Sequence, residues 1–212
     1  GILLQQPDTK SIILIFIAST AMLVVSGVPW KYILGALGIG MLVLTVFAFT
    51  RPYLMKRITT FMDPAQDLQG SSFQLRQSLI AIGSGGVFGR GLGQSVQKFT
   101  YLPEPQGDSI FAVIGEEFGL VGTFLIVILY IAFALRGLRI AFRAPDSFSR
   151  LLVVGLVILL LAQSFLNIAS IIGLFPLTGV PLVFISHGGT SLMFSLAIVG
   201  IILNISKYQN NI

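Results

Sequence analysis

Long stretches without ionisable charge limit what this chain can fold into more than any other feature. Between Leu151 and Ser206 there is no Asp, Glu, Lys or Arg, and the same holds for Ser11–Trp30 and Tyr32–Thr50. A helix that crosses a bilayer needs about 20 predominantly apolar residues. Charged residues make up only 10% of the chain, against about 25% in a typical soluble domain. The sequence therefore predicts an integral membrane protein of the all-α class.

Five spanning helices are expected, arranged as a polytopic transmembrane helix bundle. They are apolar around the whole circumference, as helices that face lipid or the centre of a bundle must be. One long connection, residues 51–109, separates the second span from the third. Within it, Ser71 or Ser72 is expected to cap a surface helix that runs to about Gly83. The predicted spans are about Ser11–Val28, Tyr32–Thr50, Ile110–Leu135, Leu151–Ile172 and Gly189–Ser206.

Basic residues between the third and fourth spans predict the orientation. Four Arg fall in the short connection 136–150. Short loops rich in Lys and Arg stay on the cytoplasmic side, whereas long loops carry less weight. We therefore expect residues 136–150 in the cytoplasm and the large loop 51–109 on the extracytoplasmic side.

Composition argues against several kinds of site. The chain has no Cys and a single His, His187, so we predict neither thiolate chemistry nor a metal site built from histidines. The formal net charge of +5 comes from basic residues scattered among apolar segments. Nucleic acid is therefore not expected as a partner.

A glycine-rich run, Gly83–Gly93, lies within the large loop. It does not match the dinucleotide pattern, because Phe88 stands where the third Gly should be, and it is not a Walker loop. Two interpretations stay open. The run is either a turn packed closely on helices, or a backbone nest for a phosphate, to which Arg90 and Lys98 add charge.

Acidic residues gather where the large loop enters the third span. Asp108 stands where a helix N-cap belongs. Alternatively, it is a general base that removes a proton from a sugar hydroxyl. Three roles stay open for Glu104: it binds a sugar hydroxyl, it adjusts the basicity of Asp108, or it is simply solvated. Glu116 and Glu117 lie about two turns into the span, where ionisable groups are candidates for function, and a structural role is equally open.

Polar residues of the last two spans are best explained structurally. Asn167 is expected to form hydrogen bonds between helices. Ser186, Thr190 or Ser191 is expected to cap the fifth span.

Three ordered blocks of the sequence form a recognisable pattern. They are Gln77-Ser-Leu-Ile-Ala-Ile-Gly-Ser-Gly-Gly-Val-Phe-Gly-Arg-Gly-Leu-Gly93, Tyr101-Leu-Pro-Glu-Pro-Gln-Gly-Asp108 with Phe111-Ala-Val-Ile-Gly-Glu-Glu-Phe-Gly119, and Thr178-Gly-Val-Pro-Leu-Val-Phe-Ile-Ser-His-Gly-Gly-Thr-Ser191. These blocks resemble the SEDS family (shape, elongation, division, sporulation). The segments Gln94–Lys98 and Tyr101–Glu104 are more similar to its FtsW or sporulation branch than to its RodA branch, with FtsW the nearest. The resemblance implies a fold of about ten spanning helices, of which residues 1–212 form the C-terminal half, with 51–109 as the large extracytoplasmic loop.

The resemblance also implies an activity. The family is expected to polymerise lipid II into glycan strands during cell division, as an inverting glycosyltransferase that releases undecaprenyl pyrophosphate. Asp108 aligns with its catalytic aspartate. Pro105-Gln106-Gly107 stands where the family usually has Ala-His-Thr, and His187 replaces a usual Tyr. The candidates for substrate binding are Arg76, Arg90, Lys98, Glu104 and Glu116, the three basic residues for the pyrophosphate.

The implied partners are lipid II, a class B penicillin-binding protein that acts as a transpeptidase, and other membrane proteins of the division machinery. The implied location is the bacterial cytoplasmic (inner) membrane, crossed several times. No cofactor is implied with certainty, and a divalent cation is left open. Two other functions are kept as alternatives: a flippase or transporter of lipid-linked precursors, and a non-catalytic division scaffold.

Overall fold

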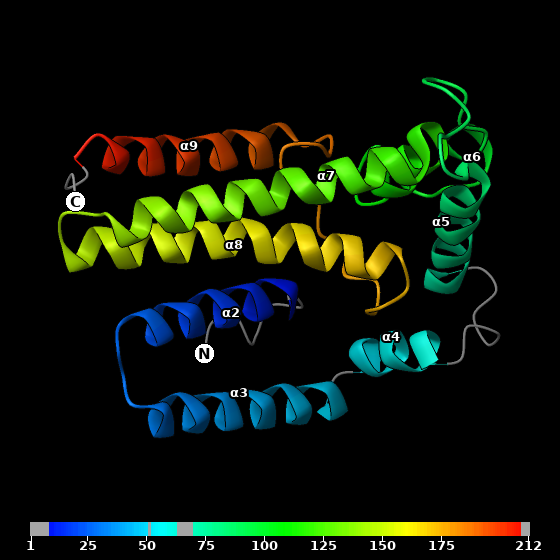
Figure 1. Cartoon of the computed structure of the whole chain (residues 1–212). Coiled ribbons are helices and arrows are strands. Elements are labelled where there is room, and N and C mark those ends of the chain that lie inside the picture. Colours follow the sequence, from blue (N-terminus) through cyan, green and yellow to red (C-terminus); the bar gives the residue numbers. More distant parts are fainter. Residues whose placement is uncertain (1–8, 51, 63–69, 209–212) are drawn as a thin grey trace. The chain divides into compact units, whose positions relative to one another are not determined.

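The computed structural model describes residues 9–50, 52–62 and 70–208, and this part of the chain contains helices and no strand. The predicted all-α class is confirmed. The helices are α2 (Thr9–Val25), α3 (Trp30–Thr50), α4 (Pro52–Met62), α5 (Ser71–Gly85), α6 (Gln97–Thr100), α7 (Ile110–Phe142), α8 (Ser147–Ile171) and α9 (Gly189–Ser206) (Figure 1).

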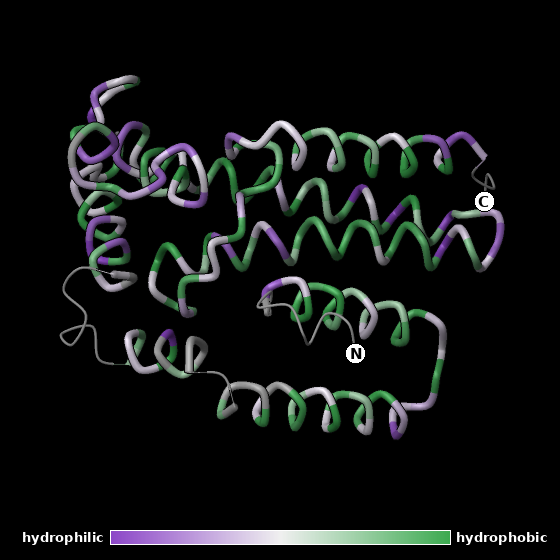
Figure 2. The backbone as a smooth tube through the Cα atoms, turned by 180° about the vertical axis from the view of Figure 1, so that it is seen from behind, coloured by the Kyte–Doolittle hydropathy of each residue, from purple (hydrophilic) through white to green (hydrophobic). Residues whose placement is uncertain are grey.

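The apolar helices coincide with the predicted spans. By length and composition, α7, α8 and α9 can cross a membrane, while Lys10–Val25 and Trp30–Val43 are shorter apolar helical segments. Figure 2 shows hydrophobic residues along most of α7, α8 and α9. Helices of this length and apolar composition are typical of a membrane protein.

The connection between α7 and α8 is much shorter than predicted. Helix α7 continues past Leu135 to Phe142, because Arg is a good helix former and can extend a spanning helix into water. Helix α8 begins at Ser147, so only residues 143–146 connect the two helices. Asp146 accepts hydrogen bonds from the backbone N of Ser149 at 2.8 Å and from its hydroxyl at 2.7 Å, which is an N-cap interaction.

Contacts divide the chain into two compact units, each described by itself. The first unit comprises Gly1–Phe47, Ile131–Gln163 and Thr190–Ile212. Its helices approach closely at glycines. A Cβ atom at Gly40 would lie 2.3 Å from the ring of Phe16, and one at Gly137 would lie 2.5 Å from Val157. Small residues at such contacts are how helices pack in a membrane, where no hydrophobic force drives them together.

The second unit comprises Ala48–Tyr130 and Ser164–Gly189. It contains α4, which the sequence analysis did not predict. Helix α5 begins at Ser71, as expected, but its N-cap residue is Gly70 and no side chain caps it. The predicted cap by Ser71 or Ser72 is therefore wrong. The Ser72 side chain is buried instead, and the Gly70 carbonyl accepts the first hydrogen bonds of the helix.

Helix α7 is interrupted at Gly119, where φ is 65° and ψ is −158°. The glycine-rich run lies against this break. A Cβ atom at Gly119 would lie 2.4 Å from the Gly89 nitrogen, and one at Gly89 would lie 2.1 Å from the Glu117 carbonyl oxygen. The run is therefore packed closely on a helix, which favours the first of its two interpretations. The backbone hydrogen bonds are Arg90 N to Glu116 O (2.9 Å), Gly91 N to Glu117 O (3.0 Å), Leu120 N to Gly86 O (3.0 Å) and Val121 N to Val87 O (3.2 Å).

Candidate functional site around Asp108

Asp108 lies in a short segment, residues 103–109, that closes on itself just before α7. The backbone N–H groups of Gly107 and Ser109 donate to the Glu104 carbonyl at 3.0 and 3.4 Å. Glu104 adopts a φ of 46°, which is uncommon for a residue with a side chain. The Ser109 carbonyl accepts the first N–H of α7, from Ala112 at 3.0 Å. Ser109 thus occupies the N-cap position that the sequence analysis considered for Asp108.

The Asp108 carboxylate is held from α5. The Gln74 amide Nε2 donates to Asp108 Oδ1 at 3.1 Å and to Ser109 Oγ at 2.9 Å. Ser109 Oγ lies 3.0 Å from the Pro103 carbonyl oxygen and 3.4 Å from Asp108 Oδ1. Helix α5 and the loop segment before α7 therefore meet at one carboxylate oxygen.

Burial of Asp108 raises the pKa of its carboxyl group above the ordinary value. Hydrogen bonds from Gln74, from the backbone N–H of Asp108 and from Ser109 lower the pKa in opposition, and the charge of Glu104 raises it further. The raised pKa reflects the cost of a charge removed from water. It also gives this carboxylate a greater affinity for a proton, which suits a general base.

Helix α8 and its following connection support the same segment from another side. The buried Asn167 amide donates to the Asp108 carbonyl and to the Val180 carbonyl, each at 2.7 Å. Asn167 was expected to link helices, but it links α8 to two loop segments. In the connection 173–188, Ser186 Oγ donates to the Gly107 carbonyl at 2.6 Å and the His187 backbone N donates to the Gln106 carbonyl at 2.8 Å. Ser186 therefore fixes the loop rather than capping α9.

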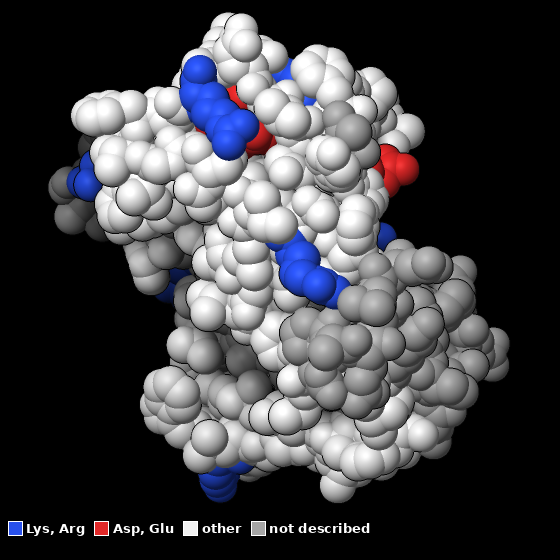
Figure 3. Space-filling model, turned by 90° about the vertical axis from the view of Figure 1, so that its right-hand side faces the viewer, with Lys and Arg blue, Asp and Glu red and all other residues white. Residues whose placement is uncertain are grey.

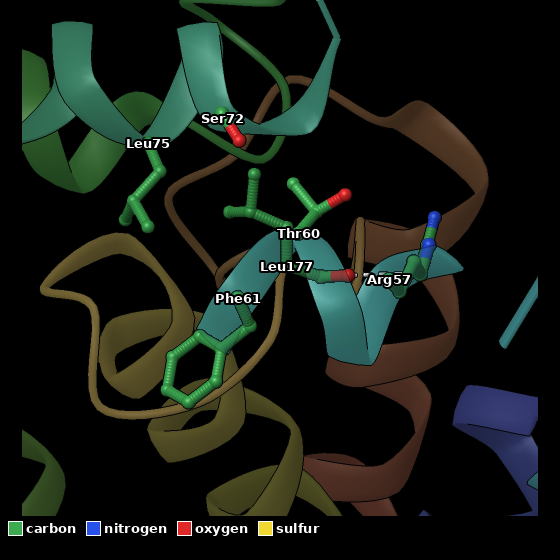
Figure 4. A pocket seen from close by; sticks show the side chains of 6 residues that line it. All are labelled: Arg57, Thr60, Phe61, Ser72, Leu75 and Leu177. Atoms are coloured by element: carbon green, nitrogen blue, oxygen red, sulfur yellow. Dashed lines mark hydrogen bonds between the residues drawn. The ribbon is translucent and has the colours of Figure 1, made fainter. Parts of the chain in front are cut away.

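Helix α4 contacts the same connection. Arg57 Nη1 donates to the Leu177 carbonyl at 2.8 Å, and Figure 4 shows this bond beside a small pocket. The Ser72 hydroxyl is buried in the pocket wall, and no hydrogen-bond partner is found for it among the described residues. The pocket is lined by Arg57, Thr60, Phe61, Ser72, Leu75 and Leu177.

Glu116 lies in a second cluster, where it fixes the loop that precedes α6. Its carboxylate is fully buried and accepts hydrogen bonds from Ser95 Oγ at 2.6 Å, Val96 N at 3.1 Å and Gln97 N at 3.3 Å. Arg90 Nη1 lies 3.4 Å from it. The two N–H groups are at the start of α6, where a carboxylate is favourable.

Lys98 and Glu117 form an ion pair beside this cluster, at 2.5 Å. Figure 3 shows a face of the molecule on which a patch of acidic side chains lies beside basic ones. Two of the basic candidates, Arg90 and Lys98, are therefore already paired with carboxylates. Arg76 and Glu104 are exposed.

The structure thus separates the predicted site residues into two groups. Glu104 shares the segment of Asp108, whereas Glu116 lies with Arg90 and Lys98, and among the described residues no hydrogen bond or ion pair joins the two groups. Gln74 and the loop contacts of Asn167 were missed. Asn167 was noticeable as an amide within a span, but nothing in a single sequence distinguishes Gln74. Residues 9–50, 52–62 and 70–208 contain no group of three or more His, Cys, Asp or Glu that could hold a metal ion.

Known proteins are similar to this chain in sequence and in fold. The chain is 43% identical to stage V sporulation protein E of Bacillus subtilis over 98% of its own length and 57% of that protein's. It is 42% identical to the probable peptidoglycan glycosyltransferase FtsW of Geobacter sp. (strain M18), over 97% of the chain and 56% of the relative. The chain thus spans about half the length of the curated relatives it matches.

Two solved structures superpose on nearly the whole chain. One, of a peptidoglycan synthase complex that coordinates polymerization and crosslinking, gives a TM-score of 0.77 at 26% identity and covers 99% of this chain and 59% of that one. The other, an aspartate-to-alanine variant of the rod shape determining protein RodA from Thermus thermophilus, gives 0.64 at 25% identity and covers 99% and 54%. The family model of the FtsW, RodA and SpoVE cell cycle proteins matches residues 1–211. The chain therefore belongs to the FtsW/RodA/SpoVE family of cell cycle proteins.

Proposed function

We propose that the intact protein is an inverting glycosyltransferase that polymerises lipid II into peptidoglycan, with Asp108 as its general base. The observation that carries the proposal is the placement of Asp108. Its carboxylate is half-buried at the start of α7 and fixed by Gln74. It makes no hydrogen bond to the first-turn N–H groups of α7 among those the structure describes, so the helix does not need it as a cap. The names of the FtsW relatives support the same activity.

The proposed step moves one proton and exchanges one bond. Asp108 accepts the proton of the acceptor GlcNAc 4-hydroxyl as that oxygen bonds to C1 of the donor MurNAc. The bond from C1 to the pyrophosphate oxygen breaks with inversion, and undecaprenyl pyrophosphate leaves with the electron pair. A protonated Asp108 then returns its proton to water.

Residues that bind substrate stay predictions. Arg76 is exposed on α5, and no salt bridge is found for it in the described part of the chain, so it is the candidate best able to meet a pyrophosphate. Arg90, Lys98 and Glu116 would need to exchange their present partners for substrate. Glu104 is exposed beside Asp108 and can reach a sugar hydroxyl.

We also propose the setting of this activity. A class B penicillin-binding protein is the expected partner, because the similar complex couples polymerization to crosslinking. Other division proteins and the bacterial inner membrane follow from the likeness to FtsW proteins. In this setting, residues 1–212 are the C-terminal part of the membrane domain, and 51–109 face the outside.

Asp108→Asn in the intact protein tests the base. The amide keeps the size and shape of the side chain but cannot accept the proton. Loss of a general base costs about 10²–10⁴ in rate, so fluorescent lipid II should give little or no glycan on a gel. Asp146→Asn is the matched control, because Asp146 is exposed at the start of α8 and Asn caps a helix about as well as Asp.

A near wild-type rate of Asp108→Asn would refute the assignment of the base. In that case a scaffold or a transporter of lipid-linked precursors would become the better proposal. Normal expression and normal melting of the inactive variant are needed to show that the loss lies in the chemistry.

A further inference from the structure

We propose that Gln74 and Gly179 give the two oxygens of Asp108 different tasks: Gln74 holds Oδ1 in place, and Gly179 keeps the space in front of Oδ2 open for the attacking hydroxyl. This inference rests on the proposed function, because it assigns a positioning residue and an access-determining residue to the same base.

The Gln74 amide is oriented by two bonds at once. Its Nε2 donates to Asp108 Oδ1 and to Ser109 Oγ, so both amide hydrogens are used. A flipped amide would set its oxygen against a carboxylate oxygen, two acceptors without a proton between them. Ser109 Oγ can then donate onward to the Pro103 carbonyl. This chain of bonds fixes the plane of the carboxylate from a helix rather than from a loop, which is how a precise site is built.

The second oxygen faces a glycine. All side-chain hydrogen bonds described for the carboxylate fall on Oδ1, while a Cβ atom at Gly179 would lie 3.7 Å from Oδ2. A hydroxyl that gives its proton to a base must come within about 2.6–3.2 Å of it. A methyl group at Gly179 would stand at that approach. Gly179 also has a φ of 63°, which a glycine adopts without strain.

Few described ionisable side chains lie on the neighbouring elements. They are Glu104 in its own segment, Arg76 on α5, Arg57 on α4, Glu116 and Glu117 in the first part of α7, and His187 in the connection 173–188. Only Glu104 among them contributes to the raised pKa of Asp108. The neutral amide of Gln74 is therefore the main adjustable influence on the carboxylate besides burial.

Gln74→Leu tests the first half of the proposal. Leu has a similar volume but donates no hydrogen bond. Without the donor the pKa of Asp108 rises, so the ionised base is lost at a higher pH as acid is added. The acid limb of the rate profile should move up by about one pH unit. Misplacement should also lower the plateau rate about 10- to 100-fold. Gln77→Leu, the same change one turn along α5, is the control and should keep the wild-type limb.

Gly179→Ala tests the second half, with Gly173→Ala as the control. Both glycines lie in the same connection at positive φ, 63° and 77°, so both changes introduce the same kind of backbone strain. A Cβ atom at Gly173 meets only Leu75 and Leu79. Gly179→Ala should lower the rate at least about tenfold more than Gly173→Ala. Equal losses would show that strain alone acts, and would overturn the role of Gly179.

A double variant separates this inference from the proposed function. If Asp108 is the base and Gln74 acts through it, Gln74→Leu should have no further effect on the residual rate of Asp108→Asn, which couples the two residues. If Asp108→Asn is inactive but Gln74→Leu keeps the wild-type profile, the proposed function stands and the role of Gln74 falls. If Asp108→Asn is active, both fall.

Discussion

Replacing Glu116 by Gln tests whether this buried carboxylate stabilises the large loop or binds the substrate. Three donors converge on it, Ser95 Oγ, Val96 N and Gln97 N, and none of its surface is exposed. An unpaired carboxylate inside a spanning helix is costly, and these three donors give the Glu116 carboxylate its hydrogen-bond partners. We expect the variant to loosen residues 86–102 before it affects anything else.

The size of the effect follows from the contacts. An amide has one acceptor oxygen, so it can take the place of Oε2 and keep Ser95 and Gln97, but its NH₂ group then faces the N–H of Val96. Hydrogen bonds to charged groups contribute about 1.5–3 kcal/mol, and a buried donor without a partner costs about 1–3 kcal/mol. Glu116→Gln should therefore destabilise the loop by about 2–4 kcal/mol, and Glu116→Leu by more, since all three donors lose their acceptor.

Limited trypsin digestion measures this opening directly, because Arg90 and Lys98 lie in the loop. Cleavage of a transiently open segment follows its population when opening is fast. A change of 2 kcal/mol or more should raise the cleavage rate at these two residues at least about 30-fold, together with a lower melting temperature. Glu104→Gln is the control, since Glu104 is exposed and surface changes stay within about 0.5 kcal/mol.

Unchanged cleavage and unchanged melting of Glu116→Gln would refute the reasoning. A variant that keeps both but loses polymerisation would instead support the prediction that Glu116 binds substrate.

The other predictions concern orientation, packing and pH. The chain has no Cys, so Ser147→Cys should be labelled only from the cytoplasmic side and Gln94→Cys only from outside; the reverse pattern would contradict the proposed orientation. Gly119→Ala should lower the melting temperature strongly or prevent folding, because its Cβ atom would meet Gly89 at 2.4 Å, whereas Gly83→Ala enters open space and should leave the melting temperature nearly unchanged. Because the pKa of Asp108 is raised, the rate of the wild-type protein should begin to fall, as pH is lowered, above the ordinary carboxyl value of about 3.9; a limb at or below that value would contradict the burial of the base.

Sequence reasoning located the apolar helices because a charge-free run of sufficient length has few alternatives. It also placed Asp108 at the start of α7, since a carboxylate before an apolar run is a local signal. It missed α4, although Pro52 at the first helical position and the apolar residues that follow are typical of a helix start. The sequence analysis assigned residues 51–109 to one long connection that carries charged residues, so this helix start was not recognised.

The contacts that define the site could not be read from spacing. Gln74 and Asp108 are 34 residues apart, and Asn167 lies 59 residues beyond Asp108. Which polar side chain meets which carboxylate depends on how helices pack. The break at Gly119 was hidden for a similar reason, because a single Gly within an apolar run is compatible with an uninterrupted helix.

The exchange of backbone hydrogen bonds across that break has a consequence for chimaeras between family members. About 14 Å beyond its first residue, α7 gives up part of its own ladder and takes partners from residues 86–91. Backbone groups left without partners at such a depth would cost several kcal/mol each. The large loop is therefore not a detachable module. A graft cut at the start of α7 would carry the glycines without their carbonyl partners, whereas a graft of residues 83–121 would transfer both halves of the exchange together.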